Sequence, residues 1–118
     1  MSVTYKTLIV WQKAYGLALS VYKATKVFPK EELYGLISQM RRAALSVVAN
    51  IAEGYIRATR QDRLHFYNIA LGSLVELECF IEFSKDVNYL SRVDYQSLIV
   101  LQNETLYLLK GFMKSQRS

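Results

Sequence analysis

Hydrophobic residues recur along the chain at steps of three and four, which is the spacing of an amphipathic helix and not the alternation of a strand. The pattern predicts four helices, over residues 7–26, 30–55, 60–87 and 92–115. Pro29 separates the first two, because proline is tolerated in the first turn of a helix but not in its interior. Short connections make consecutive helices antiparallel. We therefore expect an all-α fold, an antiparallel up-down-up-down four-helix bundle that forms a single domain over residues 1–118.

Each predicted helix has a glycine in its interior, where glycine costs about 1 kcal/mol relative to alanine. These four residues are Gly16, Gly35, Gly72 and Gly111. The close approach of a neighbouring helix is the usual compensation, and we expect it at some of these positions. A fifth glycine, Gly54, lies near the end of the second predicted helix and is expected to cap its C-terminus.

A line of polar residues runs along the second predicted helix at the same helical spacing, and it consists of Gln39, Arg42, Ser46, Asn50 and Glu53. Serine and asparagine are middling helix formers at best, so their recurrence suggests specific hydrogen bonds. The third predicted helix offers Ser73 and Glu76 as partners. The line is either a groove for a ligand or partner, or a buried network in which Arg42 pairs with Glu53 or Glu76 and sets the helix register. We favour the network, because buried polar groups must be hydrogen-bonded whatever the function.

The composition indicates a folded, cytosolic protein. The chain has 118 residues, of which 52% are hydrophobic, enough for one core and for part of a subunit interface. Its one cysteine, Cys79, has no partner for an internal disulfide, which suits a reducing compartment. The most apolar early stretch, residues 8–22, is shorter than the roughly 20 residues that span a bilayer, and it lacks a cleavage-like end. We expect a cytoplasmic protein without a membrane segment.

Catalysis finds little support in the sequence. A cysteine nucleophile needs a base beside it, and the only histidine, His65, lies roughly 21 Å from Cys79 along one helix. We interpret Cys79 as a packed apolar thiol. Residues 62–65 are one degenerate copy of the Glu-x-x-His pattern of bundle metal sites, and the chain has no second histidine. We expect no enzyme activity, no metal and no cofactor.

The charge distribution is the stronger lead to function. The net charge is +5, of which residues 1–63 carry +6 and residues 64–118 carry −1. The candidate nucleic-acid-binding residues are Arg57, Arg60 and Arg63 at the turn into the third predicted helix, followed by the weaker candidates Arg41 and Lys13. The arginine fork binds phosphate in a bidentate manner, and its plane stacks on bases. The alternative is that the cluster pairs with acidic residues of neighbouring subunits, and the sequence leaves both interpretations open.

Several segments resemble a known protein family. They are residues 10–14 (Val-Trp-Gln-Lys-Ala), 28–36 (Phe-Pro-Lys-Glu-Glu-Leu-Tyr-Gly-Leu), 39–44, 46, 50–54, 72–74 and 76–78. Together they resemble the bacterial four helix bundle protein family, whose members are encoded in intervening sequences of 23S ribosomal RNA genes, some of them labelled ribosomal proteins. The chain is also similar to the accessory factor of diversity-generating retroelements, a basic homopentameric barrel that binds nucleic acid and a reverse transcriptase. The resemblance implies a four-helix fold, a ring-shaped homopentamer and RNA binding.

Two functions from different classes follow. In the first, a homo-oligomeric bundle binds RNA or another nucleic acid through the arginine clusters, mainly by neutralising phosphates. In the second, the bundle is an assembly or adaptor protein whose main partner is another protein, such as the reverse transcriptase that the resemblance implies. Exposed tyrosines, from the nine in the chain, and apolar ridges would then form the contact surface.

Overall fold

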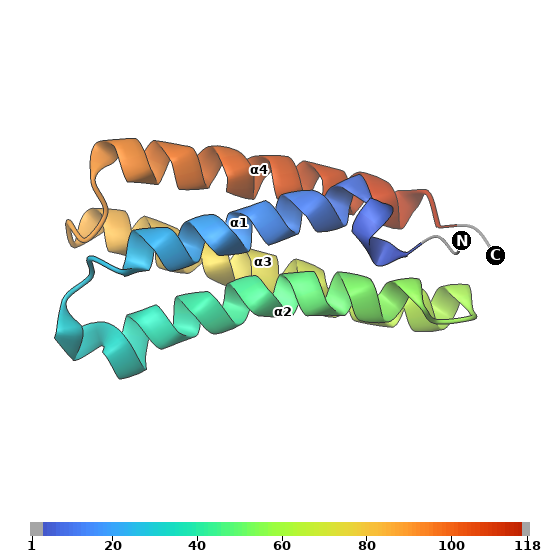
Figure 1. The fold of residues 1–118 in the computed structure, drawn as a ribbon. Coiled ribbons are helices and arrows are strands. Elements are labelled where there is room, and N and C mark those ends of the chain that lie inside the picture. Colours follow the sequence, from blue (N-terminus) through green and yellow to red (C-terminus); the bar gives the residue numbers. More distant parts are fainter. Residues whose placement is uncertain (1–3, 117–118) are drawn as a thin grey trace.

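The computed structural model describes residues 4–116, and within them every regular element is helical. The long helices are α1 (Ile9–Thr25), α2 (Ser38–Tyr55), α3 (Arg60–Asp86) and α4 (Arg92–Lys114). Three short helical turns precede α1 and α2, namely η1 (Tyr5–Thr7), η2 (Lys30–Glu32) and η3 (Leu33–Ile37). Consecutive helices lie side by side and run antiparallel (Figure 1). The predicted all-α four-helix bundle is confirmed.

Side-chain hydrogen bonds fix where α3 and α4 begin. Thr59 Oγ1 accepts from the backbone N–H of Asp62, and Ser91 Oγ accepts from that of Asp94, both at 3.1 Å. The two aspartates also place negative charge at the positive end of each helix dipole. Between the helices Asn88 has a φ of 64°, a left-handed conformation that asparagine adopts more readily than most residues. The long helices therefore end where local chemistry favours a turn.

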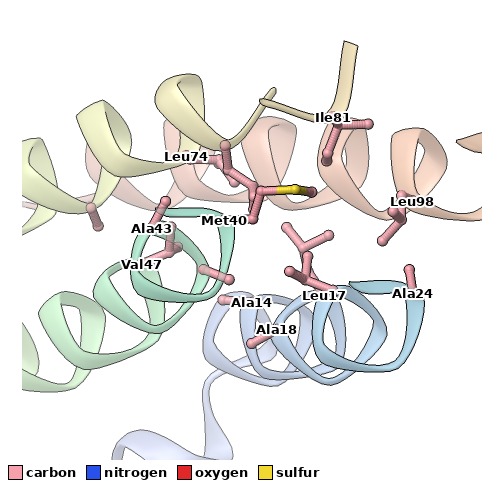
Figure 2. Packing of buried hydrophobic residues seen from close by; sticks show 14 of the residues in the cluster. Ala14, Leu17, Ala18, Ala24, Met40, Ala43, Val47, Leu74, Ile81 and Leu98 are labelled. Atoms are coloured by element: carbon pink, nitrogen blue, oxygen red, sulfur yellow. The ribbon is translucent and has the colours of Figure 1, made fainter. Parts of the chain in front are cut away.

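The core lies along the axis between the four helices. Met40 of α2, Leu17 of α1, Leu74 of α3 and Leu98 of α4 are each at most 1% exposed. Figure 2 shows Met40 pointing into the interior, with small side chains such as Ala14, Ala18 and Ala43 on the facing surfaces of α1 and α2. Large and small side chains from the four helices therefore interdigitate in the core, as close packing requires.

One buried polar side chain ties two helices together. Gln102 of α4 is completely buried, and its Nε2 donates to the backbone carbonyl of Leu74 on α3 at 2.8 Å. Its Oε1 has no hydrogen-bond partner among residues 4–116. A buried amide that finds a partner at only one relative placement of α3 and α4 favours that placement over others.

The close approach expected at a helix glycine occurs at Gly54. A Cβ at this position would lie 2.5 Å from Cε1 of Tyr67, whereas at Gly16, Gly72 and Gly111 it would meet nothing within 4 Å. At Gly35 it would meet only Oε1 of Glu32, at 3.1 Å, so none of the four interior glycines is the site of a close helix approach within the described residues. The expected capping role of Gly54 was also wrong, because α2 continues to Tyr55 and none of the described glycines has a positive φ.

The outer face of α3 is unusually apolar. Ile69, Val75 and Phe83 are 40%, 47% and 53% exposed, although they lie on a helix whose opposite face is fully buried. By length and composition alone α3 is apolar enough to cross a membrane, and it is the one such helix among the described residues. In the bundle its buried face packs against α2 and α4. Part of the hydropathy of α3 therefore comes from exposed side chains and not from the core.

Candidate nucleic-acid interface

Arg57 lies just beyond the end of α2, at the turn into α3. Its Nη2 forms an ion pair with Oε2 of Glu53, one turn earlier on α2. The guanidinium also lies over the ring of Phe66 on α3, with Cζ 4.7 Å from the ring centroid. The side chain remains exposed. The fold therefore holds the Arg57 guanidinium over an aromatic ring at the edge of the bundle.

Arg60 and Arg63 join the start of α3 to the end of α4. Arg60 Nε donates to the backbone carbonyl of Gln116 at 2.9 Å, and Arg63 Nε donates to Oε1 of the same residue at 3.2 Å. Arg63 Nη1 also donates to the carbonyl of Ala58 at 3.0 Å. A helix C-terminus attracts cations because its carbonyl groups are unsatisfied. The three predicted arginines therefore share one end of the bundle.

Further basic residues gather at that end. Both η1 and the end of α4 lie at the same end of the bundle as the α2–α3 turn (Figure 1). Among residues 4–116, this end carries six cationic side chains and two acidic ones. We define it as the basic end, and its charged residues are Lys6, Arg57, Arg60, Arg63, Lys110 and Lys114 against Glu53 and Asp62. The opposite end has a smaller excess, with seven cationic side chains against five acidic ones, and they are Lys23, Lys26, Lys30, Arg41, Arg42, Lys85 and Arg92 against Glu31, Glu32, Glu82, Asp86 and Asp94.

The sequence analysis missed Lys6, Lys110 and Lys114. Lys110 and Lys114 are distant from Arg57 in sequence, and each by itself reads as a solvated residue on a helix surface. The predicted topology, however, already indicated that these lysines lie near the arginines. In an up-down-up-down bundle the start of the chain, the second turn and the end of the fourth helix all lie at one end.

The two weaker candidates do not join the cluster. Lys13 lies on α1 and forms an ion pair with Glu104 of α4, with Nζ and Oε1 3.6 Å apart. Arg41 crosses from α2 to α1, where its Cζ lies 4.5 Å from the centroid of the Tyr22 ring. Its Nε donates to the hydroxyl of the buried Thr25 at 2.9 Å. Arg41 is therefore a link between two helices.

The polar line of α2 divides into separate contacts. Ser46 Oγ is hydrogen-bonded to Ser73 Oγ of α3 at 2.8 Å. Asn50 Nδ2 donates both to the carbonyl of Ser46 at 2.8 Å and to its hydroxyl at 3.1 Å. All three side chains are half-buried. This central part of the line therefore does connect α2 to α3 by hydrogen bonds.

The expected pairing of Arg42 with Glu53 or Glu76 is wrong. Arg42 is exposed, and its Nη2 donates to Oε1 of Gln39 on the same helix at 2.9 Å. Glu53 pairs with Arg57 instead. Arg42 and Glu53 are eleven residues apart on one helix, about 16 Å, which is beyond the reach of the two side chains. Glu76 is exposed on α3 and forms no ion pair within residues 4–116.

Burial or hydrogen bonding shifts the pKa of five described groups, which are Tyr67, Glu82, Lys85, Tyr89 and Tyr95. Burial raises the pKa of Tyr67 to about 12, against the lowering effect of the Arg63 charge, and the Tyr67 hydroxyl is buried without a hydrogen-bond partner in the described part of the chain. At the opposite end of the bundle, hydrogen bonds from Tyr95 and Lys85 lower the pKa of Glu82. Neither arrangement places a nucleophile beside a base.

Cys79 differs from its expected placement, because its side chain is exposed on α3 instead of packed in the core. The helix position turns it outward, between Val75 and Phe83 on the apolar outer face. His65 packs edge-on against Phe66, with ring centroids 5.0 Å apart. The described residues contain no group of three or more His, Cys, Asp or Glu side chains that could hold a metal ion.

Comparisons with known proteins agree with the fold. The family model described as 23S rRNA-intervening sequence protein matches residues 6–111. A solved structure from Bacteroides thetaiotaomicron, a protein with unknown function from the S23 ribosomal protein family, is similar with a TM-score of 0.83 and 27% sequence identity. That similarity covers 91% of this chain and 96% of the other. No curated protein matches.

Proposed function

The chain belongs to the 23S rRNA-intervening sequence protein family, and from that premise we propose that it is a non-enzymatic, homo-oligomeric bundle that binds RNA or another nucleic acid through its basic end. One observation supports this above all. Among residues 4–116, the basic end has six cationic side chains and two acidic ones, whereas the opposite end has seven and five. A local excess of cations attracts the phosphate backbone and accounts for most of non-specific binding.

The contacts of the arginines suit this function. The Arg60 hydrogen bond goes to a neutral backbone carbonyl, so it does not compensate the positive charge. The Arg57–Glu53 pair is about two-fifths exposed on both sides, and exposed ion pairs are weak and screened by salt. A phosphate can therefore compete with Glu53 for Arg57. The guanidinium also lies over the Phe66 ring, and an unpaired base could stack on this exposed group.

Oligomerisation is supported by the apolar outer face of α3. Ile69, Val75 and Phe83 leave a row of large side chains half-exposed in a single chain. Such a row is more typical of a subunit contact than of a surface in water. A cyclic assembly would repeat the basic end once per subunit and add the fields together.

The test measures binding of a fluorescent structured RNA across a salt titration, with duplex DNA for comparison. An Arg57→Gln/Arg60→Gln/Arg63→Gln variant is compared with Lys23→Gln/Lys26→Gln/Lys30→Gln, which removes the same charge from the opposite end. We expect the first variant to bind RNA much more weakly than wild type does. The slope of its log binding constant against log salt concentration should be smaller in magnitude by about two to three, and the second variant should resemble wild type. Equal losses in the two variants would show that net charge, and not the basic end, governs binding.

A further inference from the structure

A groove runs between the first turn of α1 and the last two turns of α4. Its volume is about 710 Å³, and its lining is mostly apolar. The lining residues are Thr7, Leu8, Ile9, Val10, Tyr107, Leu108, Lys110, Gly111, Phe112 and Lys114. Two of them are unusually exposed for large apolar side chains, because Ile9 is 64% exposed and Tyr107 is 78% exposed. An exposed apolar hollow of this size is typical of a binding surface.

The groove has the length and shape for a helix. Its α4 wall, from Tyr107 to Lys114, is about 10 Å long, or two helical turns. An amphipathic helix that lies between two others inserts side chains at positions i, i+3 or i+4 and i+7, which also span two turns. Gly111 lies along this wall, and a Cβ there would meet nothing within 4 Å, so the space beside it is open.

The charge of the groove selects the occupant. Lys110 and Lys114 lie one turn apart on its α4 side, and no lining residue is acidic. Neither lysine forms an ion pair within residues 4–116. Carboxylates one turn apart on a bound helix would meet both lysines, while the apolar floor offers a phosphate backbone no hydrogen-bond donors.

We propose that this groove binds an acidic amphipathic helix of a partner protein. The apolar side chains of the partner helix would pack against Leu108 and Phe112, and its carboxylates would pair with Lys110 and Lys114. The proposal does not rest on nucleic-acid binding. Lys110 and Lys114 also belong to the basic end, but Gly111 carries no charge. A substitution at Gly111 therefore changes the groove without changing the field that attracts RNA.

The first test uses a fluorescent peptide of about 16 residues with leucines at helical spacing and flanking glutamates. Its affinity for the full chain is compared with that of a scrambled peptide of the same composition. We expect wild type to prefer the patterned peptide, and Gly111→Trp to weaken it by at least about tenfold by filling the groove. Gly111→Ala adds one methyl group at an open position and should bind like wild type.

The second test exchanges charges. Lys110→Glu/Lys114→Glu should bind the glutamate-flanked peptide about tenfold or more weakly than wild type does. The same variant should bind a lysine-flanked peptide of the same pattern more tightly than wild type does. Lys23→Glu/Lys26→Glu, which makes the same change at the opposite end of the bundle, should keep the wild-type preference.

Four results would overturn the proposal. Wild type could fail to prefer the patterned peptide, or Gly111→Trp could bind it as well as wild type does. A scattering mass above one chain that falls to one chain in Gly111→Trp would assign the groove to a second copy. Loss of RNA binding in Gly111→Trp, with unchanged thermal unfolding, would assign the groove to nucleic acid.

Discussion

At Gly54 the absence of a side chain decides how closely α2 and α3 pack. A Cβ there would lie 2.5 Å from Cε1 of Tyr67 and 3.1 Å from the carbonyl of Arg63. Tyr67 is completely buried and packs against Phe112, so its ring has little room to move. We expect Gly54→Ala to lower the free energy of unfolding by about 1–3 kcal/mol, even though alanine favours the helix by about 1 kcal/mol. Denaturant unfolding followed by circular dichroism measures this change.

Gly111→Ala is the matched control for Gly54→Ala. It makes the same chemical change inside α4, at a position where the new methyl group meets nothing within 4 Å. Helix propensity then acts alone, so the free energy of unfolding should rise by up to about 1 kcal/mol. A rise in the free energy of unfolding in both variants would mean that α2 and α3 are further apart at Gly54 than the structure shows.

The glycines show that a sequence does not reveal which residue lies opposite a given position on the neighbouring helix. A helical pattern places Gly16, Gly72 and Gly111 in helix interiors, and their cost there is general. Close approach depends instead on what lies opposite. Gly54 is buried against Tyr67, a residue thirteen positions away that comes into contact only when α2 and α3 pair.

Among the elements, the starts of α3 and α4 were predictable, whereas the start of α2 at Ser38 and the links between helices were not. Thr59 and Ser91 cap their helices through neighbours three residues away, so their effect is visible in the sequence. The turn η3 was not anticipated, because the apolar pattern of Leu33–Ile37 continues without a break into α2. In the structure, the backbone at Gly35 departs from a helical conformation. The polar line of α2 indicated a face correctly, but spacing alone does not identify the partner of Arg42.

Adjacent arginines on α2 provide a test of which one links helices. Arg41 is half-buried and donates to Thr25 Oγ1 and to the carbonyl of Tyr22 on α1. Arg42 is exposed and, within residues 4–116, its hydrogen bond goes to Gln39 on its own helix. We expect Arg41→Ala to lower the free energy of unfolding by about 1–3 kcal/mol, because two charge-assisted hydrogen bonds and a ring contact disappear. Arg42→Ala should change it by less than about 0.5 kcal/mol.

Arg41→Lys serves as the control for charge in this comparison. Lysine keeps the positive charge but lacks the fork that reaches Thr25 and Tyr22 together, so most of the loss should remain. If Arg42→Ala destabilised the bundle as much as Arg41→Ala, Arg42 would have a structural partner outside the single chain.

Over the whole molecule, folding turns a weak charge asymmetry along the sequence into an excess of positive charge at one end of the bundle. The sequence shows only that residues 1–63 carry most of the positive charge. Folding places Lys23, Lys26 and Lys30 at the opposite end and brings Lys110 and Lys114 close to the arginines. The location of the basic end therefore follows from topology, which the helix pattern predicted, and not from the order of charges along the chain.

The assembly of whole molecules depends on the outer face of α3, where Val75 and Phe83 are about half exposed. We expect light scattering to give a mass that is a multiple of the 13.6 kDa chain. Val75→Glu/Phe83→Glu should reduce the mass to one chain with helical content unchanged, because these substitutions charge the contact surface without entering the core. Val93→Glu/Val100→Glu, at exposed positions of α4, should leave the assembly intact. A wild-type mass of one chain at all concentrations would remove oligomerisation from the proposed function. A multimer that survives both double substitutions would place its interface on another face of the bundle.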